Sequence, residues 1–74
     1  MPKLPILSGK ELVKILKKLN YGFDYQKGSH IILRQNQYPF RRMTVPNHQE
    51  ISIDTLRDII RELGLTREEF MKLL

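Results

Sequence analysis

The sequence contains no cysteine and no tryptophan, and it has no long run of apolar residues. Without cysteine the chain can form no disulfide, no thiolate metal site and no thiol nucleophile, a composition typical of a cytoplasmic protein. No segment approaches the roughly 20 consecutive apolar residues that a membrane-spanning helix requires. The first residues, 1–7, lack the apolar stretch and cleavage site of a signal peptide, so we expect neither export nor a membrane partner.

Motifs for common metals and cofactors are absent as well. The sequence has no Gly-rich phosphate-binding loop and no Walker motif. The two histidines, His30 and His48, do not belong to a metal-binding spacing such as H-E-x-x-H. We therefore expect neither a bound metal nor a small-molecule cofactor.

The sequence does contain enough apolar residues for one small folded domain. Its 74 residues are 41% hydrophobic and 28% charged, which is ordinary for a globular domain. We expect a single domain over residues 1–74, with a core so small that every apolar face must be used.

Positive charge is concentrated in the first two thirds of the chain. Residues 1–49 carry nine Lys or Arg against two acidic residues, a net charge of +7, whereas residues 50–74 have a net charge of −2. A basic surface of this kind favours polyanions, above all nucleic acid. The alternative is an ordinary solvated surface.

Two amphipathic helices are predicted, one on each side of the middle of the chain. Ser8 and Glu11 have the spacing of a capping box, and residues 20–22 (Asn-Tyr-Gly) stop the first helix. Ser52 predicts the start of the second helix and Gly64 its end, and a second capping box at residues 66–69 predicts a short final turn. The apolar residues predicted to face the core are Leu12, Ile15, Leu16 and Leu19, then Leu56, Ile59, Ile60 and Leu63, and finally Phe70, Leu73 and Leu74.

Three strands are predicted between these helices, at residues 23–27, 30–34 and 40–45, with a tight turn at residues 27–29. Pro46 ends the third strand because it lacks an amide donor. In the first strand Phe23 and Tyr25 are predicted to share one side, and Tyr25 and Phe40 are expected in the core. The predicted fold class is α+β: a three-stranded antiparallel sheet packed on two helices, with a short extra C-terminal helix and one sheet face open to solvent.

His30 is the candidate for proton transfer near neutral pH. If Ile31 and Leu33 point inward, alternation along the strand places His30 and Arg34 on the open sheet face. An imidazole there can take the proton of a ribose 2′-hydroxyl or give one to a leaving 5′-oxygen, while Lys27 and Arg34 hold the phosphate. The alternative is a surface histidine without a catalytic role, which is also the default interpretation of His48 in its loop.

Basic and aromatic residues around His30 are candidates for contacts with RNA. Arg41 and Arg42 are adjacent, so in a strand one of them points to each face, although they could simply be a solubilising pair at an edge. Tyr38 lies in a polar loop and is the best candidate to stack on a base. The lysines of the first helix either contact the RNA backbone or form only its solvated side. The full set of RNA-binding candidates is Lys10, Lys14, Lys27, Gly28, Ser29, Arg34, Tyr38, Arg41 and Arg42.

Several segments together resemble the HicA family of type II toxins, also called the YcfA-like family. Lys27-Gly28-Ser29-His30 follows a Gly-aromatic pair, residues 44–48 (TVPNH) resemble the family's V-P-x-H segment, and residues 55–65 (TLRDIIRELGL) resemble its T-L-R-x-I-L-x-x-x-G-L helix. Residues 8–12 (SGKEL) resemble the start of its first helix. The similarity extends over nearly the whole chain and keeps its order.

This resemblance implies an α-β-β-β-α fold like that of double-stranded-RNA-binding domains. It also implies an mRNA endoribonuclease, or mRNA interferase, that acts without the ribosome and is inhibited by a HicB-type antitoxin. The family's catalytic G-S-H histidine corresponds to His30. Many members have a second histidine where this chain has Ile31, which either weakens activity here or is a harmless replacement. The second acid or base remains open among Ser29, Lys27 and Tyr38.

We therefore expect a metal-independent endoribonuclease of the cytoplasm, the toxin of a toxin–antitoxin pair. The main alternative is a non-catalytic double-stranded-RNA-binding module or a translation-linked adaptor, in which His30 is inert. A structural interaction protein without a nucleic-acid role is disfavoured by the basic segment.

Overall fold

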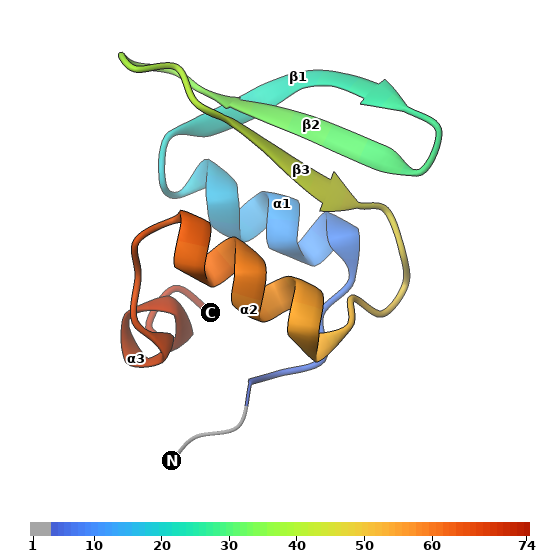
Figure 1. Cartoon of the computed structure of the whole chain (residues 1–74), viewed down its shortest axis with the longest axis vertical. Helices are drawn as coiled ribbons and strands as arrows, with labels where there is room; N and C mark the ends of the chain where they lie inside the picture. The colour runs from blue at the N-terminus through green and yellow to red at the C-terminus, as the bar shows by residue number, and fades with distance from the viewer. Residues whose placement is uncertain (1–3) are drawn as a thin grey trace.

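The computed structural model describes residues 4–74 and shows a three-stranded sheet with helices on one side (Figure 1). Its elements, in chain order, are α1 (Gly9–Lys17), β1 (Tyr21–Lys27), β2 (His30–Gln35), β3 (Arg42–Pro46), α2 (Ile53–Glu62) and α3 (Arg67–Met71). The strands are antiparallel in the order β1-β2-β3. The predicted α+β class and the order α-β-β-β-α, with a short extra helix, are confirmed.

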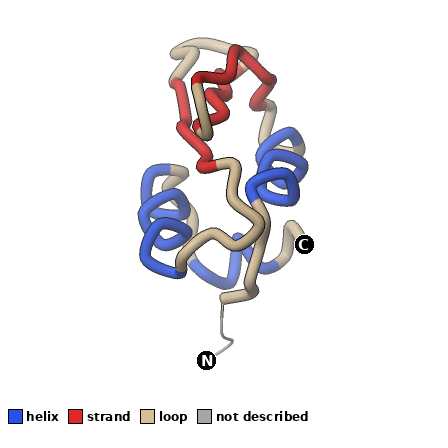
Figure 2. Tube along the Cα trace, turned by 90° about the vertical axis from the view of Figure 1, so that its right-hand side faces the viewer, coloured by secondary structure: helices blue, strands red, loops and turns tan. Residues whose placement is uncertain are grey.

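The helices cover one face of the sheet only. In Figure 2 the strands, in red, lie at one end of the molecule, and the helices, in blue, lie below them. The opposite face of the sheet has no helix against it (Figure 1). Among the described residues, no helix is long and apolar enough to cross a membrane.

Two of the three helices begin at a capping box, as predicted. The Ser8 hydroxyl accepts a hydrogen bond from the Glu11 N–H at 3.1 Å, and the Ser8 N–H donates to the Glu11 carboxylate at 3.0 Å. The same reciprocal pair joins Thr66 and Glu69 at the start of α3, at 3.1 and 2.9 Å. Hydrogen bonds from the Thr66 backbone and side chain hold the pKa of the Glu69 carboxyl below its usual value of 4.5.

The remaining helix ends also follow the sequence pattern. Ser52 caps α2 by accepting a hydrogen bond from the Thr55 N–H at 3.2 Å. Asn20, with φ of 68°, follows α1, and Gly64, with φ of 73°, follows α2. This left-handed backbone conformation stops a helix and is adopted most readily by glycine and asparagine.

The hydrophobic core lies between the helices and the inner face of the sheet. Most residues of the predicted helical stripes are buried, and Leu19, Leu63 and Leu73 pack partly against the core. Leu74 is 54% exposed, so the prediction that it packs is wrong. The fully buried side chains are Leu12, Leu16, Leu33, Val45, Leu56 and Phe70. Each contributes about 1.5–3 kcal/mol relative to full exposure.

β1 contains an irregularity that the sequence did not predict. Phe23 pairs with Leu33 and Tyr25 pairs with Ile32, so Asp24 between them is an extra residue in the ladder. Because directly paired residues share a face of the sheet, this bulge puts Phe23 and Tyr25 on opposite faces. The prediction that the two rings share one side is therefore wrong.

Tyr25 and Phe40, both expected in the core, lie at the surface. Tyr25 is 47% exposed and faces Ile32, which is buried but is not part of the main core cluster. Phe40 is 44% exposed, and its φ of 58° turns the chain before β3, which begins at Arg42. The strand is shorter than predicted, and the alternation that places a residue inward does not apply to Phe40.

Candidate nucleic-acid interface

The sheet face without helices carries the strand residues that alternate with the core positions. On β2, His30, Ile32 and Arg34 lie on this face, because Ile31 and Leu33 between them belong to the core. Their cross-strand partners lie on the same face. We call this surface, made of Gly22, Tyr25, Lys27, His30, Ile32, Arg34, Arg42, Thr44 and Pro46, the open face. The predicted outward direction of His30 and Arg34 is confirmed.

His30 lies at one end of the open face. It is the first residue of β2, is exposed, and has Lys27 on one side and Pro46 on the other as its cross-strand partners. The two-residue loop before it contains Gly28, whose φ of 58° suits a tight hairpin turn. The Ser29 carbonyl in the same loop accepts a hydrogen bond from the Asn47 N–H at 2.6 Å. The hairpin tip is thereby held against the segment that follows β3.

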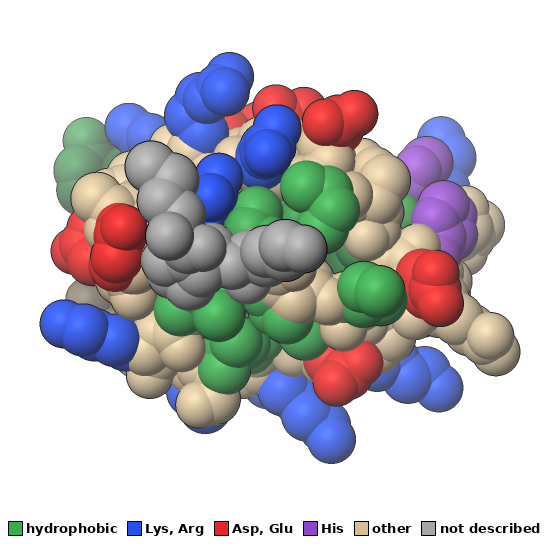
Figure 3. Space-filling model, turned by 90° about the horizontal axis from the view of Figure 1, so that it is seen from below, with side chains coloured by type: hydrophobic (Ala, Val, Ile, Leu, Met, Phe, Trp, Pro, Cys, Tyr) green, Lys and Arg blue, Asp and Glu red, His purple; other side chains and the backbone are tan. Residues whose placement is uncertain are grey.

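The start of α1 joins this end of the molecule. The Gly9 N–H donates to the His48 carbonyl at 2.9 Å. A Cβ on Gly9 would overlap the Pro46 carbonyl oxygen and lie 3.0 Å from the Asn47 Cα, so only glycine allows this approach. Figure 3 shows the histidine side chains, in purple, at the surface of this end of the molecule. The structure therefore places the loop that carries His48 beside the hairpin tip that precedes His30, whereas the sequence indicated only an exposed loop histidine that could touch RNA or a partner.

Arg34 and Arg42 lie opposite each other at the far end of the open face. The Arg42 Nε is 3.2 Å from the Asp24 Oδ2, which is enclosed and has no aligned hydrogen bond, so the pair is held by charge alone. The Arg34 guanidinium instead lies over the Phe40 ring, 5.1 Å from its centroid, a cation–π distance. Arg34 lies four positions after His30 on β2, so their Cα atoms are roughly 13 Å apart. In this structure the Arg34 guanidinium is therefore placed at the Phe40 ring rather than beside His30.

The other predicted RNA-binding residues occupy three different places. Tyr38 is 88% exposed and follows the far end of β2, which removes it from the surroundings of His30. Arg41 is exposed just before β3, and Lys10 is exposed in the first turn of α1. Lys14 borders a groove with Leu73 and Leu74 on the helix side of the molecule, away from the open face.

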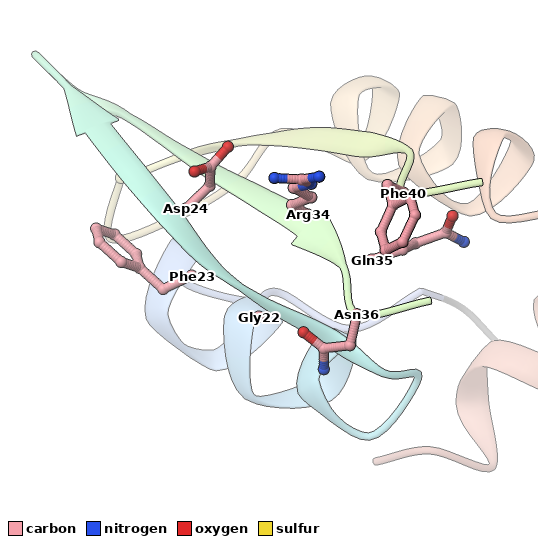
Figure 4. Close-up of a pocket in the computed structure, with 7 residues that line it drawn as sticks. All are labelled: Gly22, Phe23, Asp24, Arg34, Gln35, Asn36 and Phe40. Carbon is pink, nitrogen blue, oxygen red and sulfur yellow. The ribbon is translucent and has the colours of Figure 1, made fainter. Parts of the chain in front are cut away.

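A hollow of about 370 Å³ opens beside Arg34 (Figure 4). Its lining residues come from β1, from the end of β2 and from the loop between β2 and β3: Gly22, Phe23, Asp24, Arg34, Gln35, Asn36 and Phe40. Only Arg34 among them was a predicted site residue. Phe40, an aromatic residue that could stack on a base, was expected in the core instead. The remaining residues carry no such signal, because the bulge at Asp24 and the turn at Phe40 bring them together.

No group of three or more histidine, aspartate or glutamate side chains that could hold a metal ion occurs within residues 4–74. The polar side chains that the strands place on the open face include the His30 imidazole, the Lys27 ammonium and the guanidiniums of Arg34 and Arg42.

Residues 9–65 match the family model described as HicA toxin of bacterial toxin–antitoxin. No match was found among curated proteins or among solved structures. The matched residues run from the start of α1 to the residue after Gly64 and include the whole sheet, so both ends of the open face fall within them. Since the match covers most of the chain, this protein belongs to the HicA toxin family of bacterial toxin–antitoxin systems.

Proposed function

We propose that this toxin is an endoribonuclease that cleaves messenger RNA on the open face, with His30 as its general acid/base. Family membership supports the role of toxin and implies an antitoxin partner. The observation that carries the proposal is the position of His30, which is exposed beside Lys27 on the one sheet face that no helix covers. The acting compartment is then the cytoplasm, where messenger RNA is found.

The proposed reaction uses the ribose of the RNA as its nucleophile. His30 accepts the proton of a 2′-hydroxyl, and the 2′-oxygen attacks the neighbouring phosphorus while the bond to the 5′-oxygen breaks. The products are a 2′,3′-cyclic phosphate and a 5′-hydroxyl, whose proton comes from a second acid. The Lys27 ammonium, paired across the ladder with His30, stabilises the negative charge that develops on the phosphate oxygens.

The second acid, which gives its proton to the leaving 5′-oxygen, must lie close to His30. Lys27 and Ser29 flank the hairpin tip, and His48 lies two residues beyond Pro46, the cross-strand partner of His30. Tyr38 lies beyond the opposite end of β2, so we omit it from this role.

Ile31 supports the interpretation that a single histidine is sufficient here. Its side chain is 7% exposed in the core cluster and pairs with Val45, so this position faces the helices rather than the RNA. A histidine at the equivalent position of relatives would point into the core. We therefore treat Ile31 as a packing replacement that leaves the proposed chemistry intact.

A HicB-type antitoxin is the proposed inhibitor. The open face combines a cationic rim with the exposed ring of Tyr25, and an acidic surface that covered it would exclude RNA from His30. Inhibition then requires no change in the toxin's fold.

The test compares wild type, His30→Ala and His30→Gln on a defined RNA, each with and without EDTA. We expect wild type alone to cut, leaving a 2′,3′-cyclic phosphate whether or not EDTA is present, and to arrest growth when induced. Both variants should keep their thermal stability within about 0.5 kcal/mol, because an exposed side chain adds little to the core. They should also keep most of their RNA affinity, because that affinity comes mainly from contacts of Lys and Arg with phosphates. Glutamine in addition retains hydrogen bonding but cannot exchange a proton.

Two results would contradict the proposal. Cleavage by purified His30→Ala at the wild-type position would remove His30 from the reaction. A wild-type protein that binds RNA and never cuts it would instead indicate the alternative, a binding module without chemistry.

A further inference from the structure

The hollow beside Arg34 has walls of mixed chemistry. Figure 4 shows the Arg34 guanidinium between the Asp24 carboxylate and the Phe40 ring, with the Asn36 amide near Gly22. A Cβ on Gly22 would lie 2.9 Å from the Asn36 Oδ1, so the absence of a side chain there keeps room for that amide. An aromatic ring, a planar cation, the Asn36 amide and a carboxylate therefore border one space.

Hydrogen bonds hold the loop that builds this hollow. The Asn36 N–H donates to the Asn20 carbonyl at 2.9 Å and the Phe40 N–H donates to the Gln37 carbonyl at 2.8 Å. Gln35 is bonded twice to Arg41: its N–H donates to the Arg41 carbonyl, and its side-chain oxygen accepts from the Arg41 N–H, both at 2.9 Å. The Phe40 ring is thus placed before any ligand arrives, which reduces the entropy lost on binding.

The charges in the hollow disfavour a phosphate as its occupant. Asp24 lines the space with a carboxylate, and the Arg42 guanidinium is engaged by the Asp24 Oδ2 at 3.2 Å. A neutral planar group, in contrast, can stack on the Phe40 ring or the Arg34 plane and form hydrogen bonds with the Asn36 amide and the carboxylate. Phe40 lies outside the core cluster and is 44% exposed, and its ring contacts the Arg34 guanidinium and, edge-on at 6.4 Å between centroids, the Tyr38 ring.

We propose that this hollow binds one unpaired nucleobase of the RNA and thereby selects where the chain is cut. This inference rests on the proposed function, because the selected base matters only if RNA lies along the open face. The hollow lies roughly 13 Å along β2 from His30, so the bound base would stand at a fixed offset of a few nucleotides from the broken bond. Unpaired rather than double-stranded RNA is then the substrate class, since a paired base cannot leave its stack without cost.

The test measures binding without cleavage. Single-stranded oligonucleotides in which every ribose is 2′-O-methylated cannot be cut by a 2′-hydroxyl, and four homopolymers and an abasic chain of equal length serve as probes. For wild type we expect at least one base to bind roughly tenfold more tightly than the abasic chain, the usual size of one base–aromatic stack. In Phe40→Ala this ratio should fall close to one, while affinity for the abasic chain stays unchanged, because Phe40 carries no charge.

A second variant and a control accompany this measurement. Arg34→Lys keeps the charge but loses the plane that stacks, so it should lower the base-to-abasic ratio and keep the abasic affinity. Ile53→Ala removes a comparably exposed apolar side chain from α2, far from the open face, and should keep the wild-type ratio. Thermal unfolding of each variant confirms that it is folded.

The outcomes separate this inference from the nuclease proposal. An unchanged ratio in folded Phe40→Ala and Arg34→Lys overturns the base site, even if His30-dependent cleavage is intact. A ratio that depends on Phe40 in a protein that cuts no RNA supports the base site and overturns only the nuclease. If the base site and the nuclease are both correct, the RNA sites cut by wild type should share one base at a fixed distance from the broken bond. The sites cut by Phe40→Ala should show no such shared base.

Discussion

At the scale of single residues, Asp24 gives two neighbouring arginines different roles. Arg42 is paired with Asp24, whereas the Arg34 guanidinium lies over the Phe40 ring. Asp24→Asn should release Arg42 to bind a phosphate, which makes the fall of log affinity with log salt steeper by about 0.7 for single-stranded RNA. Arg34→Ala should make that fall shallower by about the same amount. Binding titrations over a series of salt concentrations measure both changes.

A charge change elsewhere provides the control for this prediction. Asp58→Asn removes one negative charge from an exposed position on α2, so it alters net charge but not the open face. If Asp58→Asn steepens the fall of log affinity with log salt as much as Asp24→Asn does, only the total charge matters, and the specific role of Asp24 is refuted.

At the scale of elements, α1 positions the loop beside His30 through its contact with residues 46–48. Gly9→Ala would push its new methyl group against the Pro46 carbonyl, which we expect to cost about 1–3 kcal/mol of folding free energy. The shift would reach the hairpin tip through the bond from the Asn47 N–H to the Ser29 carbonyl, so cleavage should slow as well. Urea unfolding and cleavage rates, measured where the variant is fully folded, test both effects.

The matched control for Gly9→Ala is Ser8→Ala. It removes the cap of the same helix, at a cost of about 1 kcal/mol, but leaves the approach of α1 to residues 46–48 untouched. It should therefore reduce stability and keep the cleavage rate. Equal cleavage rates for folded Gly9→Ala and wild type would show that the proposed coupling does not exist.

At the scale of the whole molecule, one short helix closes the core. A domain of 74 residues has a total stability of about 4–11 kcal/mol, so the loss of a single large buried side chain is serious. Phe70 of α3 is completely buried although it lies outside the residues that match the family model.

Phe70→Ala should destabilise the protein by about 3–5 kcal/mol, seen as a lower urea midpoint. Leu74→Ala, at an exposed position nearby, should change stability by less than about 0.5 kcal/mol. A loss below about 1 kcal/mol for Phe70→Ala would mean that α3 is dispensable for the core.

The two halves of the candidate site differ in how far they could be predicted. His30 and Arg34 follow from alternation along β2, whose inner residues are plainly apolar, and alternation is a local property. Phe40 and Asp24 do not, because periodicity placed Phe40 in a strand and gave Asp24 no special position. Their roles depend on how β1, β2 and the loop at residues 36–41 meet.

Local sequence alone determined the helices with their caps, the hairpin turn, the basic character of the first two thirds and the direction of His30. These features depend on side-chain spacing within a few residues, so they can be read without knowing the fold. Only the tertiary structure decided which arginine is paired, which aromatic ring faces solvent and which loop residues line the hollow. Those outcomes depend on contacts between segments far apart in the chain, where the insertion of one residue into a ladder reverses the face of every side chain beyond it.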